Sequence, residues 1–134
     1  MDLGLSGKTV IVTGASKGIG LAVARAFVAE GARVGLVARG AEALDAAQAA
    51  LRSLGGEVAV VAADLRAADQ AEQAVAFIEA RLGPVDVLVN SAGAARKRAP
   101  ETLDAAAWRE GLDAKFFTYI HTVSYTHLTL PTKA

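Results

Sequence analysis

The sequence predicts an α/β fold built on a doubly wound parallel sheet. Four short runs of apolar, mostly β-branched residues show no polar alternation, which is typical of strands buried on both faces. Segments with helical spacing of apolar residues separate these runs, so we expect a crossover helix after each strand. A glycine-rich turn follows the first strand, at a place where such folds can hold phosphate.

The elements follow in order along the chain. We expect strands at residues 8–13, 33–38, 57–62 and 85–89. We expect helices at residues 18–30, 41–54, 67–82 and 105 to about 122. Glycine ends the first three helices, at Gly31, at Gly55, and at Gly83 before Pro84. Right-handed crossovers then give the strand order 3-2-1-4, with a ligand crevice at the carboxyl ends of strands one and four.

Two of the expected helices carry an apolar face, which is typical of helices that pack on a core. In the first helix, one face collects Ile19, Ala22, Val23, Ala26 and Phe27. In the fourth, one stripe collects Trp108, Leu112, Phe116 and Ile120.

The composition excludes several classes of protein. With 134 residues, 53% of them hydrophobic and 21% charged, the chain suits one folded domain. The formal net charge of zero argues against nucleic acid or an anionic membrane as a partner. The absence of cysteine excludes disulfides, thiolate metal sites and cysteine catalysis. No leader and no membrane-length apolar run is present, so we expect a cytoplasmic protein.

The turn Thr13–Gly20 is the strongest functional signal. It lies between a strand and a helix, which is the context that a dinucleotide pyrophosphate site requires. Gly14 permits the tight turn, Gly18 lets the backbone approach phosphate, and Gly20 lets the helix pack closely on the sheet. The alternative is a turn with a structural role alone. The chain lacks a Gly-Lys-Ser/Thr sequence, so a phosphate loop of the ATPase kind is not expected.

The spacing TGxxxGxG, with Asp64-Leu65 after the third strand and Asn-Ser-Ala-Gly at residues 90–93, resembles the short-chain dehydrogenase/reductase family. The resemblance covers roughly residues 5–122, the amino-terminal half of such an enzyme. It implies a Rossmann-type domain in a nicotinamide-dependent oxidoreductase that interconverts carbonyl and hydroxyl groups of a small molecule by hydride transfer. It also implies that the full-length enzyme, called here the parent, is a homodimer or homotetramer.

The resemblance also assigns roles to individual residues. It implies that Asp64 contacts the adenine ring, that Leu65 lines its pocket, and that Asn90 braces the sheet. The alternative for Asp64 is to cap the helix from Ala67 onward. The complete set of expected cofactor-binding residues is Gly14, Ser16, Lys17, Gly18, Ile19, Gly20, Arg39, Asp64, Leu65, Asn90, Ala92 and Gly93, of which Ala92 and Gly93 would lie along the ribose. Ser91 departs from the usual asparagine.

The end of the second strand indicates the choice of cofactor. NAD-specific sites place an acid there to hold the ribose 2′-hydroxyl, whereas this chain has Ala38. Arg39 follows, and Lys17 lies in the glycine turn. Two cations without an acid suit a 2′-phosphate, so we expect NADP(H) rather than NAD(H). The alternative is that Arg39 is a solvated residue at a strand end.

The catalytic residues that the resemblance implies are missing. The family uses a serine after the fifth strand and a Tyr-x-x-x-Lys on the next helix, but Tyr119 and Tyr125 are followed at that spacing by Val123 and Thr129. We therefore assign no catalytic residue. Lys115 stands where the family usually has an asparagine, and a subgroup variant, an altered proton relay and a solvent-facing lysine all remain open. No metal site is expected, and His121 and His127 are taken as incidental.

The last residues have another explanation. The ten residues at 123–132 match the translation of an adaptor used in transposase-based sequencing libraries. We therefore divide the chain into a partial domain, residues 1–122, truncated after the fourth strand and its helix, and a non-native tail, residues 123–134. The alternative is a natural divergent terminus. Such a fragment is expected to be inactive, and the competing hypothesis is a non-enzymatic NADP(H)-binding module.

Overall fold

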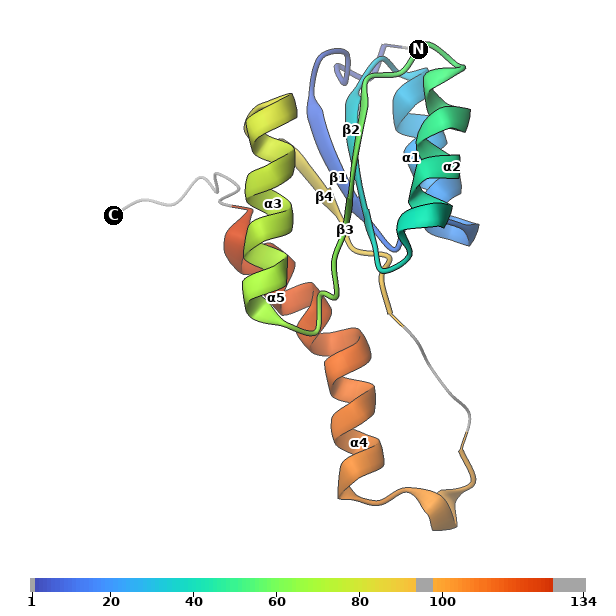
Figure 1. Ribbon diagram of the computed structural model, residues 1–134, viewed down its shortest axis with the longest axis vertical. Coiled ribbons are helices and arrows are strands. Elements are labelled where there is room, and N and C mark those ends of the chain that lie inside the picture. The colour runs from blue at the N-terminus through green and yellow to red at the C-terminus, as the bar shows by residue number, and fades with distance from the viewer. Residues whose placement is uncertain (1, 94–97, 127–134) are drawn as a thin grey trace, which may run out of the picture.

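The computed structural model describes residues 2–93 and 98–126. Its centre is a four-stranded sheet in the order β3-β2-β1-β4 (Figure 1). The strands are β1 (Thr9–Thr13), β2 (Arg33–Ala38), β3 (Val58–Ala62) and β4 (Val87–Val89). All three strand pairs are parallel. The predicted α/β class and strand order are confirmed, with β4 at one edge of the sheet.

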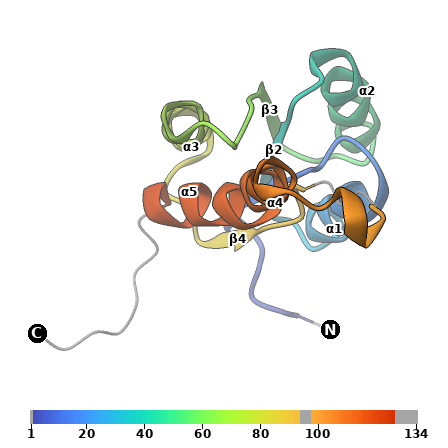
Figure 2. The same cartoon turned by 90° about the horizontal axis from the view of Figure 1, so that it is seen from below.

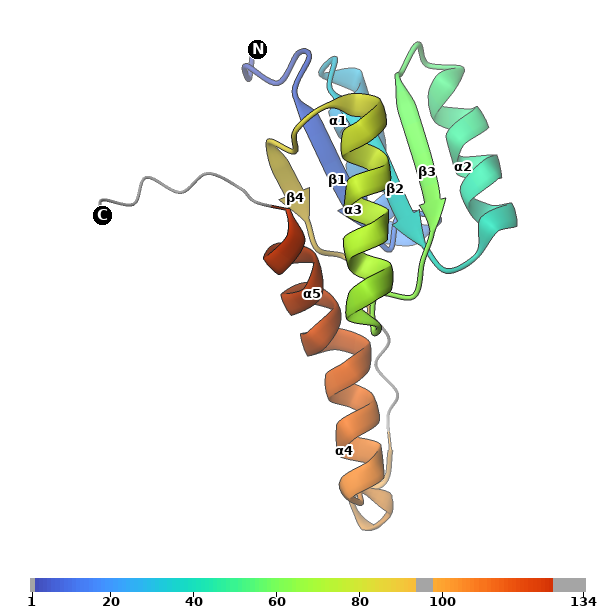
Figure 3. The ribbon, with the colours of Figure 1, turned by 60° about the vertical axis from the view of Figure 1, so that its left-hand side comes forward.

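Helices cover both faces of this sheet. Helices α1 (Gly18–Ala29) and α2 (Ala41–Arg52) lie on one face, and α3 (Ala68–Leu82) lies on the other (Figures 1 and 3). A short 3₁₀ turn, Pro100–Thr102, precedes α4 (Ala105–Gly111). A π-helical segment, Leu112–Phe117, then joins α4 to α5 (Thr118–Tyr125). The single helix expected at 105–122 is therefore three segments, and it ends at Tyr125 instead of Thr122.

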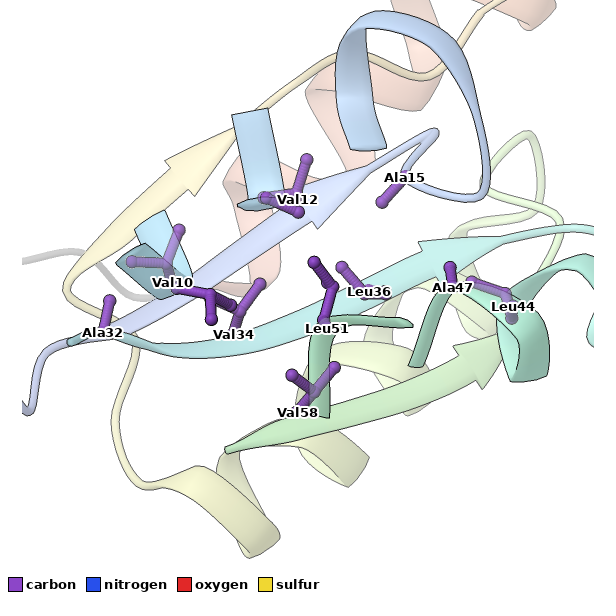
Figure 4. Close-up of a cluster of buried hydrophobic side chains, with 12 residues drawn as sticks. Val10, Val12, Ala15, Ala32, Val34, Leu36, Leu44, Ala47, Leu51 and Val58 are labelled. Atoms are coloured by element: carbon purple, nitrogen blue, oxygen red, sulfur yellow. The ribbon is translucent and has the colours of Figure 1, made fainter. Parts of the chain in front are cut away.

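The core consists of two hydrophobic clusters, one on each face of the sheet. Side chains alternate along a strand, so Val10 and Val12 enter the cluster under α1 and α2 while Ile11 enters the cluster under α3. Figure 4 shows the first cluster, in which Leu44 and Leu51 of α2 meet the β-branched residues of the strands. Continuous apolar strands are thus explained by burial on both faces, as the sequence indicated.

The predicted apolar face of α1 is wrong in part. Ile19 is 78% exposed, and Ala22 and Ala26 are exposed too, although Val23 and Phe27 do pack against the core. The buried residues are Gly20, Ala24 and Val28, spaced four apart. Gly20 has no side chain and therefore marks the closest approach of the helix to the turn, so the buried face is centred on it.

The apolar stripe of the last helical segments faces solvent. Helix α4 projects away from the sheet toward one end of the molecule (Figures 1 and 3), and Figure 2 shows it end-on. Trp108 is 62% exposed, Leu112 48%, Phe116 54% and Ile120 44%. The stripe is thus continuous but does not contribute to the core. Among the described residues, none of the helices combines the length and apolar character needed to cross a membrane.

One glycine in the sheet tests this packing. A Cβ built on Gly35 would lie 2.5 Å from Cγ2 of the buried Ile78 of α3. We expect Gly35→Ala to lower the free energy of unfolding by about 1–3 kcal/mol through overpacking. Pulse proteolysis in urea measures this at low protein concentration. Gly111→Ala is the control, since nothing lies within 4 Å of its Cβ, and a similar loss there would contradict the packing argument.

The exposed stripe and the edge of β4, which pairs with no further strand in the described part of the chain, lead to a second prediction. Contiguous apolar surface and free strand edges favour association, so we expect the 134-residue chain to be poorly soluble. The double variant Leu112→Lys, Phe116→Lys should raise the soluble fraction after centrifugation, whereas Arg109→Lys, a change at a polar position of α4, should not. A soluble monomer of the unaltered chain in analytical ultracentrifugation would show the prediction to be wrong.

Candidate cofactor-binding site

The residues expected to bind a cofactor follow the carboxyl ends of four parallel strands. The glycine turn follows β1, Arg39 follows β2, Asp64 and Leu65 follow β3, and Asn90 begins the segment after β4. Parallel strands end at the same edge of a sheet, so these four loops lie at one edge (Figure 3). The order reverses between β1 and β4, which is where a ligand crevice is expected.

The turn after β1 and the loop after β4 approach each other closely at Gly14. Gly14 has φ +64°, and a Cβ there would lie 2.7 Å from the Ser91 carbonyl oxygen and 2.8 Å from Ala92 Cα. A Cβ on Gly20 would overlap the carbonyl oxygen of Gly14. Both glycines are therefore required by close backbone approach.

Thr13, the last residue of β1, fixes this junction, a role that was not predicted from the sequence. Its side chain is fully buried. The backbone amides of Ser91 and Ala92 both donate to Thr13 Oγ1 at 3.1 Å, and the hydroxyl faces the Val89 carbonyl at 3.4 Å. A hydroxyl at the end of an otherwise apolar strand is the signal that could have identified it, because a buried polar group needs partners.

The remaining glycine of the turn faces open space. Gly18 has φ +60°, and no atom lies within 4 Å of a Cβ built there. The first amides of α1 begin beside it and have no partner within the helix, so this end attracts an anion. Lys17 is exposed at the N-cap, Ser16 is half-buried, and Ile19 presents an exposed apolar side chain.

Asp64 forms a closed pair with Arg66. The carboxylate accepts from Arg66 Nη2 at 2.8 Å, from Arg66 Nε at 3.0 Å and from the Arg66 backbone amide at 3.0 Å. Hydrogen bonds from the Arg66 side chain lower the pKa of Asp64, and the charge of Arg39 lowers it further. The alternative role as a helix cap is not seen, because α3 begins at Ala68 and its N-cap, Ala67, has no side-chain hydrogen bond.

The two cations expected to choose the cofactor lie at the same edge. Arg39 is exposed directly beyond β2, and Ala38 occupies the strand end where an acid would be needed for a ribose hydroxyl. Within the described residues, neither Lys17 nor Arg39 forms a salt bridge. The charge of Arg39 lowers the pKa of Asp64, and the two residues follow the adjacent strands β2 and β3.

Helix α5 contacts the loops after β3 and β4. Thr122 is 1% exposed and donates to Asn90 Oδ1 at 2.7 Å. His121 Nδ1 lies 2.8 Å from the Leu65 carbonyl oxygen. The prediction that His121 is incidental is therefore wrong. Leu65 is 4% exposed and belongs to the core cluster under α3, so its side chain is turned inward. His127 lies outside the described residues.

Lys115 lies within the π-helical segment and touches the loop after β4. Gly93 has φ +147°, and a Cβ there would lie 2.8 Å from Lys115 Cδ and 3.2 Å from the Ala114 carbonyl oxygen. The ammonium group lies 5.8 Å from the centre of the Tyr119 ring. Lys115 is exposed, yet its stem packs across Gly93 at the edge of the crevice. π-Helical turns of this kind are frequent at functional sites.

Ser124 and Tyr125 are neighbours in α5 but have different surroundings. Ser124 is exposed and donates to the Ile120 carbonyl oxygen at 2.8 Å within its own helix. Tyr125 packs against the core cluster under α3. Among the residues that the structure describes, no group of three or more His, Asp or Glu side chains could hold a metal ion.

The chain is similar to known proteins over most of its length. The sequence model of the short chain dehydrogenase family matches residues 8–131. Galactitol 2-dehydrogenase (L-tagatose-forming) of Cereibacter sphaeroides is 46% identical over 107 residues, which cover 79% of this chain and 41% of that protein.

Two solved structures superimpose closely. An NADPH-bound short chain oxidoreductase of Pseudomonas aeruginosa PAO1, described as containing an atypical catalytic center, is 37% identical with a TM-score of 0.87, covering 91% of this chain and 48% of that one. L-Sorbose reductase of Gluconobacter frateurii, complexed with NADPH and L-sorbose, is 31% identical with a TM-score of 0.89, covering 94% and 48%. The chain thus spans less than half the length of these proteins, and it belongs to the short chain dehydrogenase family.

Proposed function

We propose that this chain is the cofactor-binding half of an NADP(H)-dependent oxidoreductase that interconverts carbonyl and hydroxyl groups of a small molecule. The observation that carries the proposal is the convergence of the glycine turn, Arg39, Asp64 and the loop after β4 at one edge of the sheet. The NADPH named in both superimposed structures supports the choice of cofactor.

The glycine turn fits the pyrophosphate. Gly18 leaves open space beside the first amides of α1, where a Cβ would otherwise intrude. The amides and the positive end of the helix dipole favour a doubly anionic group. Gly14 and Gly20 shape the turn, and Ser16 and Ile19 flank it. Ile19 is then an exposed apolar side chain that the cofactor covers.

Arg39 and Lys17 fit the 2′-phosphate. A guanidinium can bind two phosphate oxygens in a fork, and the ammonium of Lys17 supplies a second charge. Both side chains are exposed and, within the described part of the chain, neither is used in a salt bridge. The absence of an acid at Ala38 removes the group that would repel the phosphate.

The loops after β3 and β4 would hold the adenosine. Hydrogen bonds from Arg66 lower the pKa of Asp64 and so favour its ionised form, and a carboxylate can accept from the adenine amino group. Leu65 supports the adenine pocket from beneath. Ala92 and Gly93 present small residues along the ribose, and Asn90 braces the loop through Thr122.

The bound nicotinamide supplies or accepts the hydride. The residues of this chain bind and orient the cofactor, and we assign none of them to the chemical step. The serine, tyrosine and lysine that the family uses would follow the fourth strand's helix in the parent. Lys115 would stand at the edge of the parent's proton relay. We propose that the parent is a homodimer or homotetramer.

We further propose that residues 123–134 are not native to this protein. The support is the match of residues 123–132 to adaptor translation. The family match runs to residue 131 and helix α5 continues to Tyr125, so neither marks a boundary at Val123. A chain that ends naturally here would instead be an NADP(H)-binding module without turnover.

The test is to read the source DNA across the codons for Thr122 and Val123 by a transposase-free method. We expect the reading frame to continue into a serine and a Tyr-x-x-x-Lys, and the resulting enzyme to oxidise NADPH in the presence of a carbonyl panel. A genome that encodes residues 123–134 followed by a stop codon would overturn the fragment proposal and favour the binding module.

Cofactor choice gives a sharp prediction. In the longest chain that the source DNA encodes, Arg39→Ala should weaken NADPH binding about tenfold or more, because a charge-assisted bond to the 2′-phosphate is lost. The affinity for NADH should change little. Arg81→Ala is the control, since Arg81 lies over Phe77 near the far end of α3. Fluorescence titration measures both cofactors, and equal losses for NADPH and NADH would contradict the assignment of Arg39.

The phosphate turn gives another. Gly18→Ala should weaken both NADPH and NADH about tenfold or more, because a Cβ at φ +60° costs roughly 1–2 kcal/mol and fills the space beside the helix amides. Gly4→Ala, at φ +68° and with no atom within 4 Å, carries the same backbone strain away from the site. If both variants bind the cofactors equally well, the pyrophosphate does not lie at Gly18.

A further inference from the structure

Two consecutive residues of α5 reach two different loops of the proposed cofactor site. His121 Nδ1 lies 2.8 Å from the Leu65 carbonyl oxygen, in the loop after β3. Thr122 Oγ1 lies 2.7 Å from Asn90 Oδ1, in the loop after β4. The two loops are 25 residues apart in the chain, counted from Leu65 to Asn90. Helix α5 therefore fixes the position of one loop relative to the other, which no contact between sequence neighbours could do.

The contact of His121 determines where one hydrogen of its ring lies. A carbonyl oxygen can only accept, so Nδ1 must carry a hydrogen. The ring of Phe117, one turn earlier, lies 6.1 Å away between centres and limits the movement of the imidazole.

The Leu65 carbonyl is linked to Asp64 by a single rigid group. The carbonyl of Leu65 and the amide of Arg66 belong to the same planar peptide. That amide donates to Asp64 Oδ1 at 3.0 Å. Because the peptide is planar, fixing its carbonyl also fixes the direction of its N–H, and so the position of the carboxylate that accepts from it. The inward-facing side chain of Leu65 anchors the other side of the peptide.

We propose that His121 is a positioning residue for the adenine end of the cofactor. It acts through the Leu65–Arg66 peptide on Asp64 and does not itself touch the cofactor. The inference rests on the proposed function, in which Asp64 receives the adenine ring. Thr122 has a different role. Its hydroxyl hydrogen lies near three acceptors, Asn90 Oδ1 and the carbonyl oxygens of Thr118 and Tyr119. The contact with Asn90 attaches α5 to the loop after β4.

The test compares two substitutions at one position. His121→Asn keeps an amide donor near the place of Nδ1, whereas His121→Leu removes the donor at similar volume. Ile120→Ala, at an exposed position of the same helix, is the control. Dissociation constants are measured for NADPH and for reduced nicotinamide mononucleotide, which lacks the adenosine, in the longest chain that the source DNA encodes.

We expect His121→Leu to weaken NADPH binding between about twofold and tenfold, the range of one lost hydrogen bond, with no change for the mononucleotide. His121→Asn and Ile120→Ala should bind both as the unaltered protein does. If His121→Leu does not fold, His121→Gln replaces it. The glutamine amide lies one methylene farther out than that of asparagine, so it should not donate to the Leu65 carbonyl, and NADPH binding should weaken in the same way.

Three results would overturn the inference. An unchanged NADPH affinity in the leucine variant would show that the contact does not matter for binding. Equal weakening of NADPH and the mononucleotide, or failure of His121→Asn to restore binding, would indicate a general structural effect. If the unaltered protein itself does not bind NADPH, the proposed function fails, and this inference fails with it.

Discussion

The architecture of the site depends on the buried hydroxyl of Thr13. Its oxygen accepts hydrogen bonds from the backbone amides of Ser91 and Ala92. These bonds join the end of β1 to the loop after β4, across the point where the strand order reverses. Without this junction the glycine turn and the β4 loop would have no fixed relation. The close approach at Gly14 follows from it, since the carbonyl of Ser91 lies where a side chain would be. Strand β4 is short and half-buried, so this anchor matters more here than in a long strand.

Two kinds of contact hold the loops of the crevice in place: close backbone approach at glycines, and hydrogen bonds from side chains. Glycine at positions 14, 20 and 93 allows backbone segments to touch, and at Gly93 the neighbour is the stem of Lys115 in a π-helical turn. Elsewhere the loops are held at longer range by α5, through His121 to the β3 loop and Thr122 to the β4 loop. Arg39 and Lys17 remain outside these contacts, which leaves two cations at the edge for a ligand phosphate.

Much of this could be predicted from the sequence, because the signals were local. Apolar runs ended by glycine identified the strands and their order, and the spacing of Gly14, Gly18 and Gly20 identified the turn. The contacts of Thr13, His121 and Thr122 could not be predicted, since each joins residues more than thirty positions apart. The buried face of α1 was misplaced because periodicity counts Ile19 as core, whereas close packing at Gly20 rotates the helix and exposes it. The π-helical segment around Lys115 could not be predicted either, because the apolar residues keep their regular spacing through it.

Hydrogen–deuterium exchange with and without NADPH, in the longest chain that the source DNA encodes, tests whether these loops form one crevice. We expect slower exchange in four separate segments together: the turn at residues 14–20, Arg39, the loop at 64–66 and the loop after β4. We expect no change at the far edge of the sheet around Gly56 and Leu82. Protection confined to one of the four segments, or located at that far edge, would contradict the claim that these loops form a single cofactor crevice.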